Sequence, residues 1–95
     1  MGTYIILSKL TDDGAKTLKK NPERVKKVNE ELEKMGVKVI QQYVVFGEYD
    51  FVNIVEAESN IDVMKAMVDL ASRGTIRTIT LPAVEVEEFL SSMKS

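Results

Sequence analysis

Residues 43–51 read Tyr43-Val44-Val45-Phe46-Gly47-Glu48-Tyr49-Asp50-Phe51, and the architecture can be worked out from them. Four of the six aromatic residues of the chain lie in these nine positions, flanked by valines. Aromatic and β-branched side chains favour strands, and Gly-Glu-Tyr-Asp interrupts them with turn residues. The pattern predicts a β-hairpin whose polar, aromatic tip is the best candidate for a ligand-facing surface.

The two arms of this hairpin are expected over residues 37–46 and 51–57. With positions 48 and 49 as a two-residue turn, Phe46 pairs with Phe51 across the hairpin. The glycine can instead sit in a bulge, and a slip of one residue would exchange the two faces of the sheet. Apolar residues occur on both faces of the arms, so neither face is expected to lie against water.

The rest of the chain reads as further strands and helices. Runs of β-branched residues predict strands, and apolar residues at helical spacing predict helices. In chain order we expect a strand over 3–9, a helix from Thr11 or Asp12 to Gly36 that kinks or restarts at Asn21-Pro22, a helix over about 60–72, a strand over 75–81 that Pro82 terminates, and an amphipathic helix over 86–93. The last helix either packs on its own domain or reaches a partner.

This order of elements is that of a ferredoxin-like βαββαβ sandwich of the α+β class, with an added C-terminal helix, in a single domain over residues 1–95. Right-handed crossovers place both helices on one face of an antiparallel sheet and leave the other face bare. Because the strands are apolar on both faces, the bare face needs a cover, and a second copy of the sheet supplies it. The sequence therefore predicts a homodimer, or a higher even oligomer, of the dimeric α/β-barrel type.

The composition excludes several classes of protein. The chain has 95 residues and a net charge of −2, with no Cys and no His. Disulfides, thiol chemistry and imidazole chemistry are therefore excluded, and we expect no cofactor and no metal. No apolar run approaches the roughly 18 residues of a membrane-spanning helix, and the N-terminus lacks the features of a signal peptide. We expect a cytoplasmic protein with no membrane partner.

A cluster of cations gives the first predicted helix a basic stripe. Such a stripe is either a footprint for nucleic acid or a solvated helix face, and i,i+4 pairs with Glu30 and Glu31 favour the solvated face. The aromatic signature of RNA-recognition domains is absent, so nucleic acid is not expected as a partner. The stripe consists of Lys16, Lys19, Lys20, Arg24, Lys26 and Lys27.

Several small and apolar side chains on the predicted helices are expected to point inward. Ala15 is expected to do so on the first helix. Met64 and Met67 are either a pliable binding surface or core residues, and methionines at helical spacing favour the core.

Separated motifs, in order along the chain, resemble those of the GYD domain family, small bacterial and archaeal proteins of unestablished function. The resemblance spans nearly the whole chain and implies a ferredoxin-like fold without supplying an activity. Its motifs are Thr-Tyr-Ile-Ile-Leu-Ser-Lys-Leu-Thr at 3–11, Asn-Pro-Glu-Arg at 21–24, Gly-Glu-Tyr-Asp-Phe-Val at 47–52, Ser-Arg-Gly-Thr at 72–75 and Thr-Leu-Pro-Ala at 80–83.

More loosely, residues 43–55 followed by 74–80 resemble the effector domain of the leucine-responsive regulator family. In that family the Gly-x-Tyr-Asp turn lies near amino-acid effector sites at subunit interfaces, so the resemblance implies a site at residues 47–50. This chain has no helix-turn-helix, so direct gene regulation is not implied.

A candidate ligand site is centred on the turn. Backbone amides at the glycine and the Arg77 guanidinium can hold a carboxylate, the tyrosines can supply walls, and Asp50 can accept from an amine. The alternative is structural: the glycine permits the turn, Asp50 caps backbone amides, and the tyrosines close the end of the barrel. The candidate ligand-binding residues are Tyr43, Gly47, Tyr49, Asp50, Asn53 and Arg77.

Three classes of function follow. The first is a dimeric module that binds a small molecule near the turn. The second is a cofactor-independent enzyme of the dimeric α/β-barrel kind that acts on aromatic substrates, against which the absence of His counts. The third is a structural or interaction protein in which the sheet or the C-terminal helix docks a larger partner. The first is the leading hypothesis.

Overall fold

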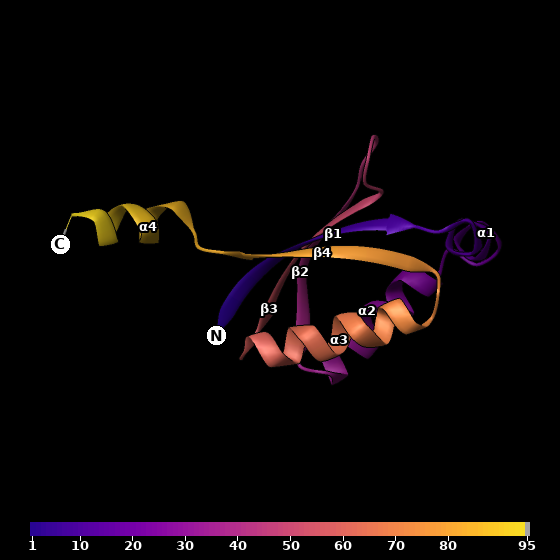
Figure 1. Ribbon diagram of the computed structural model, residues 1–95, viewed down its shortest axis with the longest axis horizontal. Helices are drawn as coiled ribbons and strands as arrows, with labels where there is room; N and C mark the ends of the chain where they lie inside the picture. Colours follow the sequence, from indigo (N-terminus) through magenta and orange to yellow (C-terminus); the bar gives the residue numbers. More distant parts are fainter. Residues whose placement is uncertain (95) are drawn as a thin grey trace.

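The computed structural model describes residues 1–94 and contains a four-stranded antiparallel sheet (Figure 1). The strand order is β2-β3-β1-β4, so the first strand lies in the middle of the sheet and β2 and β4 are its edges. This is the order of a ferredoxin-like fold, and the predicted α+β class is confirmed. The strands are β1 (Gly2–Leu10), β2 (Val37–Val44), β3 (Phe51–Ala57) and β4 (Ile76–Ala83).

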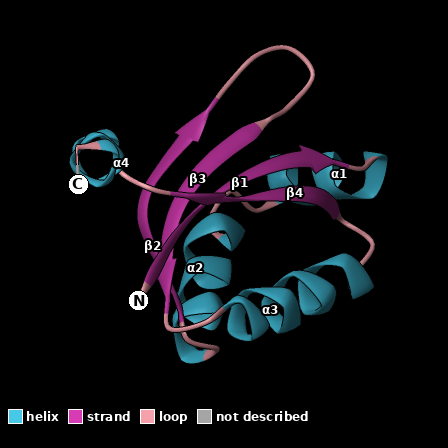
Figure 2. Cartoon of the chain, turned by 60° about the vertical axis from the view of Figure 1, so that its left-hand side comes forward, coloured by secondary structure: helices cyan, strands magenta, loops and turns pink. Residues whose placement is uncertain are grey.

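Two helices, α2 and α3, cover one face of this sheet (Figure 2). The helix predicted from residue 11 or 12 to 36 restarts at Asn21-Pro22, because α1 ends at Lys20 and α2 begins at Arg24. α4 projects from the end of β4, away from the sheet (Figure 1), and the molecule measures 52 × 29 × 18 Å. The helices are α1 (Asp12–Lys20), α2 (Arg24–Lys34), α3 (Asn60–Ser72) and α4 (Val86–Met93).

The start of α1 is fixed to the turn that precedes β4. Thr11 caps the helix by accepting a hydrogen bond from the Gly14 amide (3.1 Å) and donates its hydroxyl to the Gly74 carbonyl (2.8 Å). A Cβ on Gly14 would lie 1.9 Å from the Thr75 carbonyl oxygen, so only glycine fits there. Ala15, which was expected to point inward, is exposed, because the close approach buries Gly14 instead.

The core lies between the sheet and the two covering helices. Alternate residues of β1 and β3 point toward the helices and are buried, as the strand period of two requires. Met67 packs against this core, as predicted. The buried apolar residues are Tyr4 and Ile6 of β1, Leu32 of α2, Val37 of β2, Phe51, Val55 and Ala57 of β3, and Val63, Ala66 and Leu70 of α3.

The predicted hairpin pairing is wrong by two residues. Val44, and not Phe46, pairs with Phe51, so the connection is a loop over residues 45–50. The loop is wider than predicted because Asp50 hydrogen-bonds to β1: its amide donates to the Ser8 carbonyl (2.8 Å), and its Oδ2 accepts from the Leu10 amide (2.8 Å). Because the shift is an even number of residues, it does not exchange the two faces of the hairpin.

Pro82 does not terminate β4, which continues to Ala83. Pro82 pairs with Tyr4 and lies on an edge strand, where a missing amide donor can face away from the ladder.

Candidate functional site

The six predicted ligand-binding residues lie in three separate places. Asn53 points toward the helices, because its partner across the hairpin is Gln42, which is hydrogen-bonded to α2. Tyr43 and Arg77 lie on the opposite face, on the two edge strands of the sheet. The other three, Gly47, Tyr49 and Asp50, lie in the loop between β2 and β3. One protomer therefore does not gather the six residues into one site.

Within the loop, the polar groups serve its conformation. Gly47 has φ +112°, a backbone region that glycine adopts most readily. The Asp50 carboxylate accepts from the Leu10 amide, so it stabilises the end of β1. The loop projects from the sheet on the side opposite α2 and α3 (Figure 1). These contacts correspond to the structural alternative for Asp50.

A cavity of about 110 Å³ lies between the sheet and helices α1, α2 and α3, and we call it the helix-side cavity. Its wall is mostly apolar, with Ile6, Leu32 and Phe51 among its residues. The polar residues that line it are Ser8, Thr17, Arg24, Asn29, Gln42, Asn53, Arg73 and Thr75.

Asn53 carries a buried hydrogen-bond acceptor in this cavity that lacks a donor. It is only 9% exposed, and its Oδ1 has no hydrogen bond within residues 1–94. The amides of Asn29 and Gln42 bond to each other, with Asn29 Nδ2 2.9 Å from Gln42 Oε1. A buried acceptor without a donor is costly in free energy, so Asn53 marks a position where a donor would bind.

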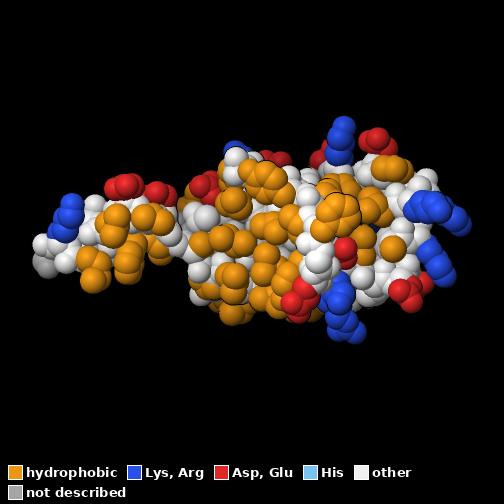
Figure 3. Space-filling view, turned by 90° about the horizontal axis from the view of Figure 1, so that it is seen from above, with side chains coloured by type: hydrophobic (Ala, Val, Ile, Leu, Met, Phe, Trp, Pro, Cys, Tyr) orange, Lys and Arg blue, Asp and Glu red, His pale blue; other side chains and the backbone are white. Residues whose placement is uncertain are grey.

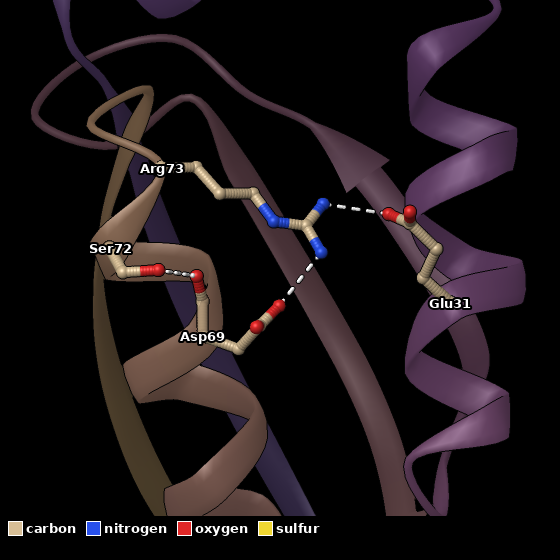
Figure 4. A network of polar contacts seen from close by, with 4 residues as sticks. All are labelled: Glu31, Asp69, Ser72 and Arg73. Carbon is tan, nitrogen blue, oxygen red and sulfur yellow. Dashed lines mark hydrogen bonds and ion pairs between the residues drawn. The ribbon is translucent and has the colours of Figure 1, made fainter.

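Arg73 links the two helices that cover the sheet (Figure 4). Its Nη1 lies 2.7 Å from Glu31 Oε1 on α2, and its Nη2 lies 2.7 Å from Asp69 Oδ2 on α3. The hydrogen bond from Arg73 lowers the pKa of Glu31 below its ordinary value, and the same bond raises the pKa of Arg73. Both terminal nitrogens of Arg73 are thus bonded to carboxylates.

The sheet face opposite α2 and α3, which we call the open face, is predominantly apolar. Figure 3 shows hydrophobic side chains gathered over it, with charged side chains toward its rim. It comprises Thr3, Ile5, Leu7 and Lys9 of β1, Lys38, Gln41 and Tyr43 of β2, Val52, Ile54 and Glu56 of β3, and Arg77, Ile79, Leu81 and Ala83 of β4.

The C-terminal helix forms without packing on the domain. Glu85 caps α4, because its Oε2 accepts from the amides of Glu87 (2.7 Å) and Glu88 (3.2 Å). None of the residues of α4 is buried. Its apolar residues Phe89 and Met93 are exposed. Figure 3 shows hydrophobic side chains of the projecting C-terminal segment on the same side of the molecule as the open face.

A third apolar surface runs along the outside of α3. Ile61, Met64 and Val68 are exposed at helical spacing, and we call them the outer stripe of α3. Beside it lies a groove lined by Met64, Val68 and Pro82 among others. The expectation that Met64 lies in the core is wrong: it is 62% exposed, because Val63 and Ala66 occupy the inward positions.

Sequence reasoning missed most of the helix-side cavity. Ser8, Arg24 and Arg73 belong to the quoted family motifs, and Arg24 also to the basic stripe, but the sequence does not mark them or Asn29 as ligand-binding residues. A signal was present in the strands: Ser8, Gln42 and Asn53 are polar residues at positions whose neighbours on the same face are apolar.

Residues 1–94 contain no group of three or more acidic side chains placed to hold a metal ion. None of the helices they form is long and apolar enough to cross a membrane.

Comparison with known proteins identifies a family and a curated relative. Residues 4–93 match the family model described as the GYD domain. A protein of Thermus thermophilus, named glutamine synthetase and cystathionine beta-lyase binding protein, is 57% identical over 95 residues. The match covers 99% of this chain and 100% of that protein.

Two solved structures share the fold. The crystal structure of TTHA0845 from Thermus thermophilus has a TM-score of 0.56 at 24% identity, covering 90% of this chain and 95% of the other. The crystal structure of FFRP-DM1 has a TM-score of 0.59 at 29% identity, covering 88% of this chain and all of the other.

Proposed function

The chain belongs to the GYD domain family, and from that premise we propose that it is a protein-interaction module that pairs with a second copy and binds a metabolic enzyme. The observation that carries the proposal is that both the open face and the outer stripe of α3 present uncovered apolar side chains within the described chain. Apolar surface on two opposite sides suits a protein that contacts two different partners at once.

A second copy is the proposed cover of the open face. Four strands about 4.8 Å apart, each about 20 Å long, present roughly 400 Å² of sheet plane, a large apolar patch for a monomer. The charges of the face lie at its two ends: Glu56 pairs with Lys38 at one end, and Lys9 pairs with Arg77 at the other. The side chains between them are mostly apolar, so a two-fold axis through the middle of the face would bring apolar side chains of the two copies together.

A metabolic enzyme is the proposed partner of the outer stripe of α3. Support comes from the relative that spans the same length and is named for binding glutamine synthetase and cystathionine beta-lyase. An exposed apolar helix face docks into a groove of a partner through residues at this spacing. Methionine is common on surfaces that accept more than one partner, because its side chain adapts its shape.

A small-molecule site at residues 47–50 is retained as a second proposal. The projection of this loop on the side of the open face supports it, since a second copy on that face would lie beside the loop (Figure 1). The site would then be completed by the dimer. The cytoplasm is the proposed location, which the absence of Cys supports.

The enzyme-binding surface can be tested with two methionines. Met64 is 62% exposed on α3 and Met93 is 70% exposed on α4, so the same change to lysine is tolerated by the fold at both. We expect Met64→Lys to weaken binding of purified glutamine synthetase or cystathionine beta-lyase about tenfold or more, and Met93→Lys to leave it unchanged, as measured by biolayer interferometry.

Two results would contradict this proposal. Loss of binding in Met93→Lys but not in Met64→Lys would assign the interaction to α4. If the unaltered protein bound neither enzyme from its own organism, the proposed partner class would be wrong.

A further inference from the structure

We propose that the helix-side cavity binds a small hydroxycarboxylate, held by Arg24 and by the unpaired Oδ1 of Asn53. This proposal is independent of the protein-binding role, because the cavity lies beneath the helices and away from the open face and the outer stripe of α3.

The ligand of this cavity must carry a hydrogen-bond donor. Asn53 is 9% exposed and lines the cavity, and its Oδ1 lacks a hydrogen bond within the described chain. The two other amides of the cavity, Asn29 and Gln42, already bond to each other at 2.9 Å. A ligand with an O–H or N–H group would therefore satisfy the one buried acceptor that the fold leaves open.

The charged residues of the cavity indicate the charge of its ligand. Arg24 and Arg73 line the cavity, and no Asp or Glu is among its lining residues. Arg73 is engaged with Glu31 and Asp69, whereas the Arg24 guanidinium has no hydrogen-bonding partner in residues 1–94. Arg24 is the first residue of α2, so the positive end of the helix dipole adds to the potential, and the acidic N-cap residue Glu23 is exposed and does not line the cavity. The cavity therefore favours an anion.

The basic stripe strengthens this preference. Its lysines lie on α1 (Lys16, Lys19 and Lys20) and in the first turn of α2 (Lys26 and Lys27), close in sequence to Thr17 and Arg24 of the cavity wall. Clustered charges of one sign raise the local concentration of an oppositely charged ligand. The stripe thus acquires a role as an attractor of small anions.

The cavity wall also favours a hydroxyl over an ammonium as the donor group of the ligand. An ammonium placed beside Asn53 would find no carboxylate on the cavity wall, and a buried charge without a counter-charge is disfavoured. A hydroxyl is neutral and donates equally well to Oδ1. A hydroxy acid is therefore preferred over an amino acid of the same shape.

The size of the cavity limits the ligand. An apolar cavity of about 150 Å³ accommodates benzene, so a cavity of about 110 Å³ suits a molecule of roughly five non-hydrogen atoms. Glycolate has this size, and glycine and acetate differ from it only in carrying an ammonium or a hydrogen in place of the hydroxyl. These three acids form a matched set of probes.

The test is an NMR titration of ¹⁵N-labelled protein with sodium glycolate, glycine and sodium acetate at constant ionic strength, following the side-chain amide of Asn53. We expect saturable shifts with glycolate and affinities for glycine and acetate that are lower by about tenfold. Absence of saturable shifts with glycolate, or equal affinities for the three acids, would overturn the proposal.

Two variants with the same change of charge locate the anion. Arg24→Gln removes a cation that lines the cavity, and Lys26→Gln removes an exposed cation two residues away that does not. We expect glycolate affinity to fall about tenfold in Arg24→Gln and to stay within about twofold in Lys26→Gln. Equal losses in the two variants would indicate attraction by net charge alone and would contradict a site.

Asn53→Leu removes the acceptor that is proposed to bind the hydroxyl of glycolate. The variant should bind glycolate only as tightly as acetate, and its affinity for acetate should be unchanged. If glycolate still binds Asn53→Leu more tightly than acetate does, Asn53 is not its partner and the assignment fails. Should this variant not fold, the comparison of the three acids on the unaltered protein still decides the matter.

Discussion

The two faces of the sheet are built from the same strands and differ in what covers them. On the face toward α2 and α3, Ile6 is 2% exposed and the side chains pack into one core. On the open face, its neighbour Ile5 is half-buried, and Ile79 and Leu81 are exposed. The comparison shows that the chain uses only part of the apolar side chains of its strands for its own core and leaves the others uncovered on the open face.

The largest expected effect is a difference in stability between alanine variants of two neighbouring residues, Ile6 on the helix side of the sheet and Ile5 on the open face. Ile6→Ala should lower the free energy of unfolding by about 2–5 kcal/mol, because it leaves a cavity in a packed core. Ile5→Ala should cost much less in the monomer, and its cost should grow with protein concentration as the dimer forms. Urea unfolding at two protein concentrations measures both. A cost for Ile5→Ala that equals that of Ile6→Ala at the lower concentration would mean that the open face stabilises the monomer itself.

The second expected effect concerns assembly. Ile79→Lys places a charge on the open face and should weaken the homodimer about tenfold or more, as measured by sedimentation velocity. Ile61→Lys makes the same change on α3 and should leave the dimer intact. Should the unaltered protein sediment as a monomer at micromolar concentration, the open face would need another partner and the proposed dimer would be excluded.

The smallest expected effect concerns the ion pairs of Arg73, which link α2 and α3. The hydrogen bond from Arg73 lowers the pKa of Glu31, so folding is favoured by the ionised form of Glu31. This contribution is complete above the ordinary pKa of a glutamate and is lost as the pH falls through the lowered value in the folded protein. Arg73→Gln should raise the pKa of Glu31 toward its ordinary value in a carboxyl-carbon NMR titration. An unchanged pKa would show that the ion pair does not persist in solution.

Most of the fold could be predicted because each element has a local cause. The alternation of residues in the strands, the Thr11 cap and the break at Asn21-Pro22 are all short-range signals. The sequence left open which side chains of the hairpin face the helices, and the structure assigns Phe51, Asn53 and Val55 to the helix side. The register itself could not be predicted, because Asp50 bonds to Ser8 and Leu10, which lie far away in the sequence.

The helix-side cavity could not be predicted for the same reason. Arg24 begins one helix and Asn53 lies in the middle of a strand, and only the packing of α2 on the sheet brings both to one cavity wall. The turn at residues 47–50 attracted attention because its aromatic residues are adjacent in sequence. Adjacency in sequence identified a loop, whereas the unpaired buried acceptor identified in the structure lies outside that loop.

The central position of β1 has a consequence for how the chain folds. Thr3 pairs with Ala83, nearly the whole chain away, and Thr3 also pairs with Glu56 on the other side. Such distant pairings slow folding, because a long loop must close before they form. Until β4 has been synthesised and docked, β1 is an unprotected edge on which another nascent chain can add a strand. Aggregation during synthesis is therefore expected to depend on how quickly β4 reaches β1.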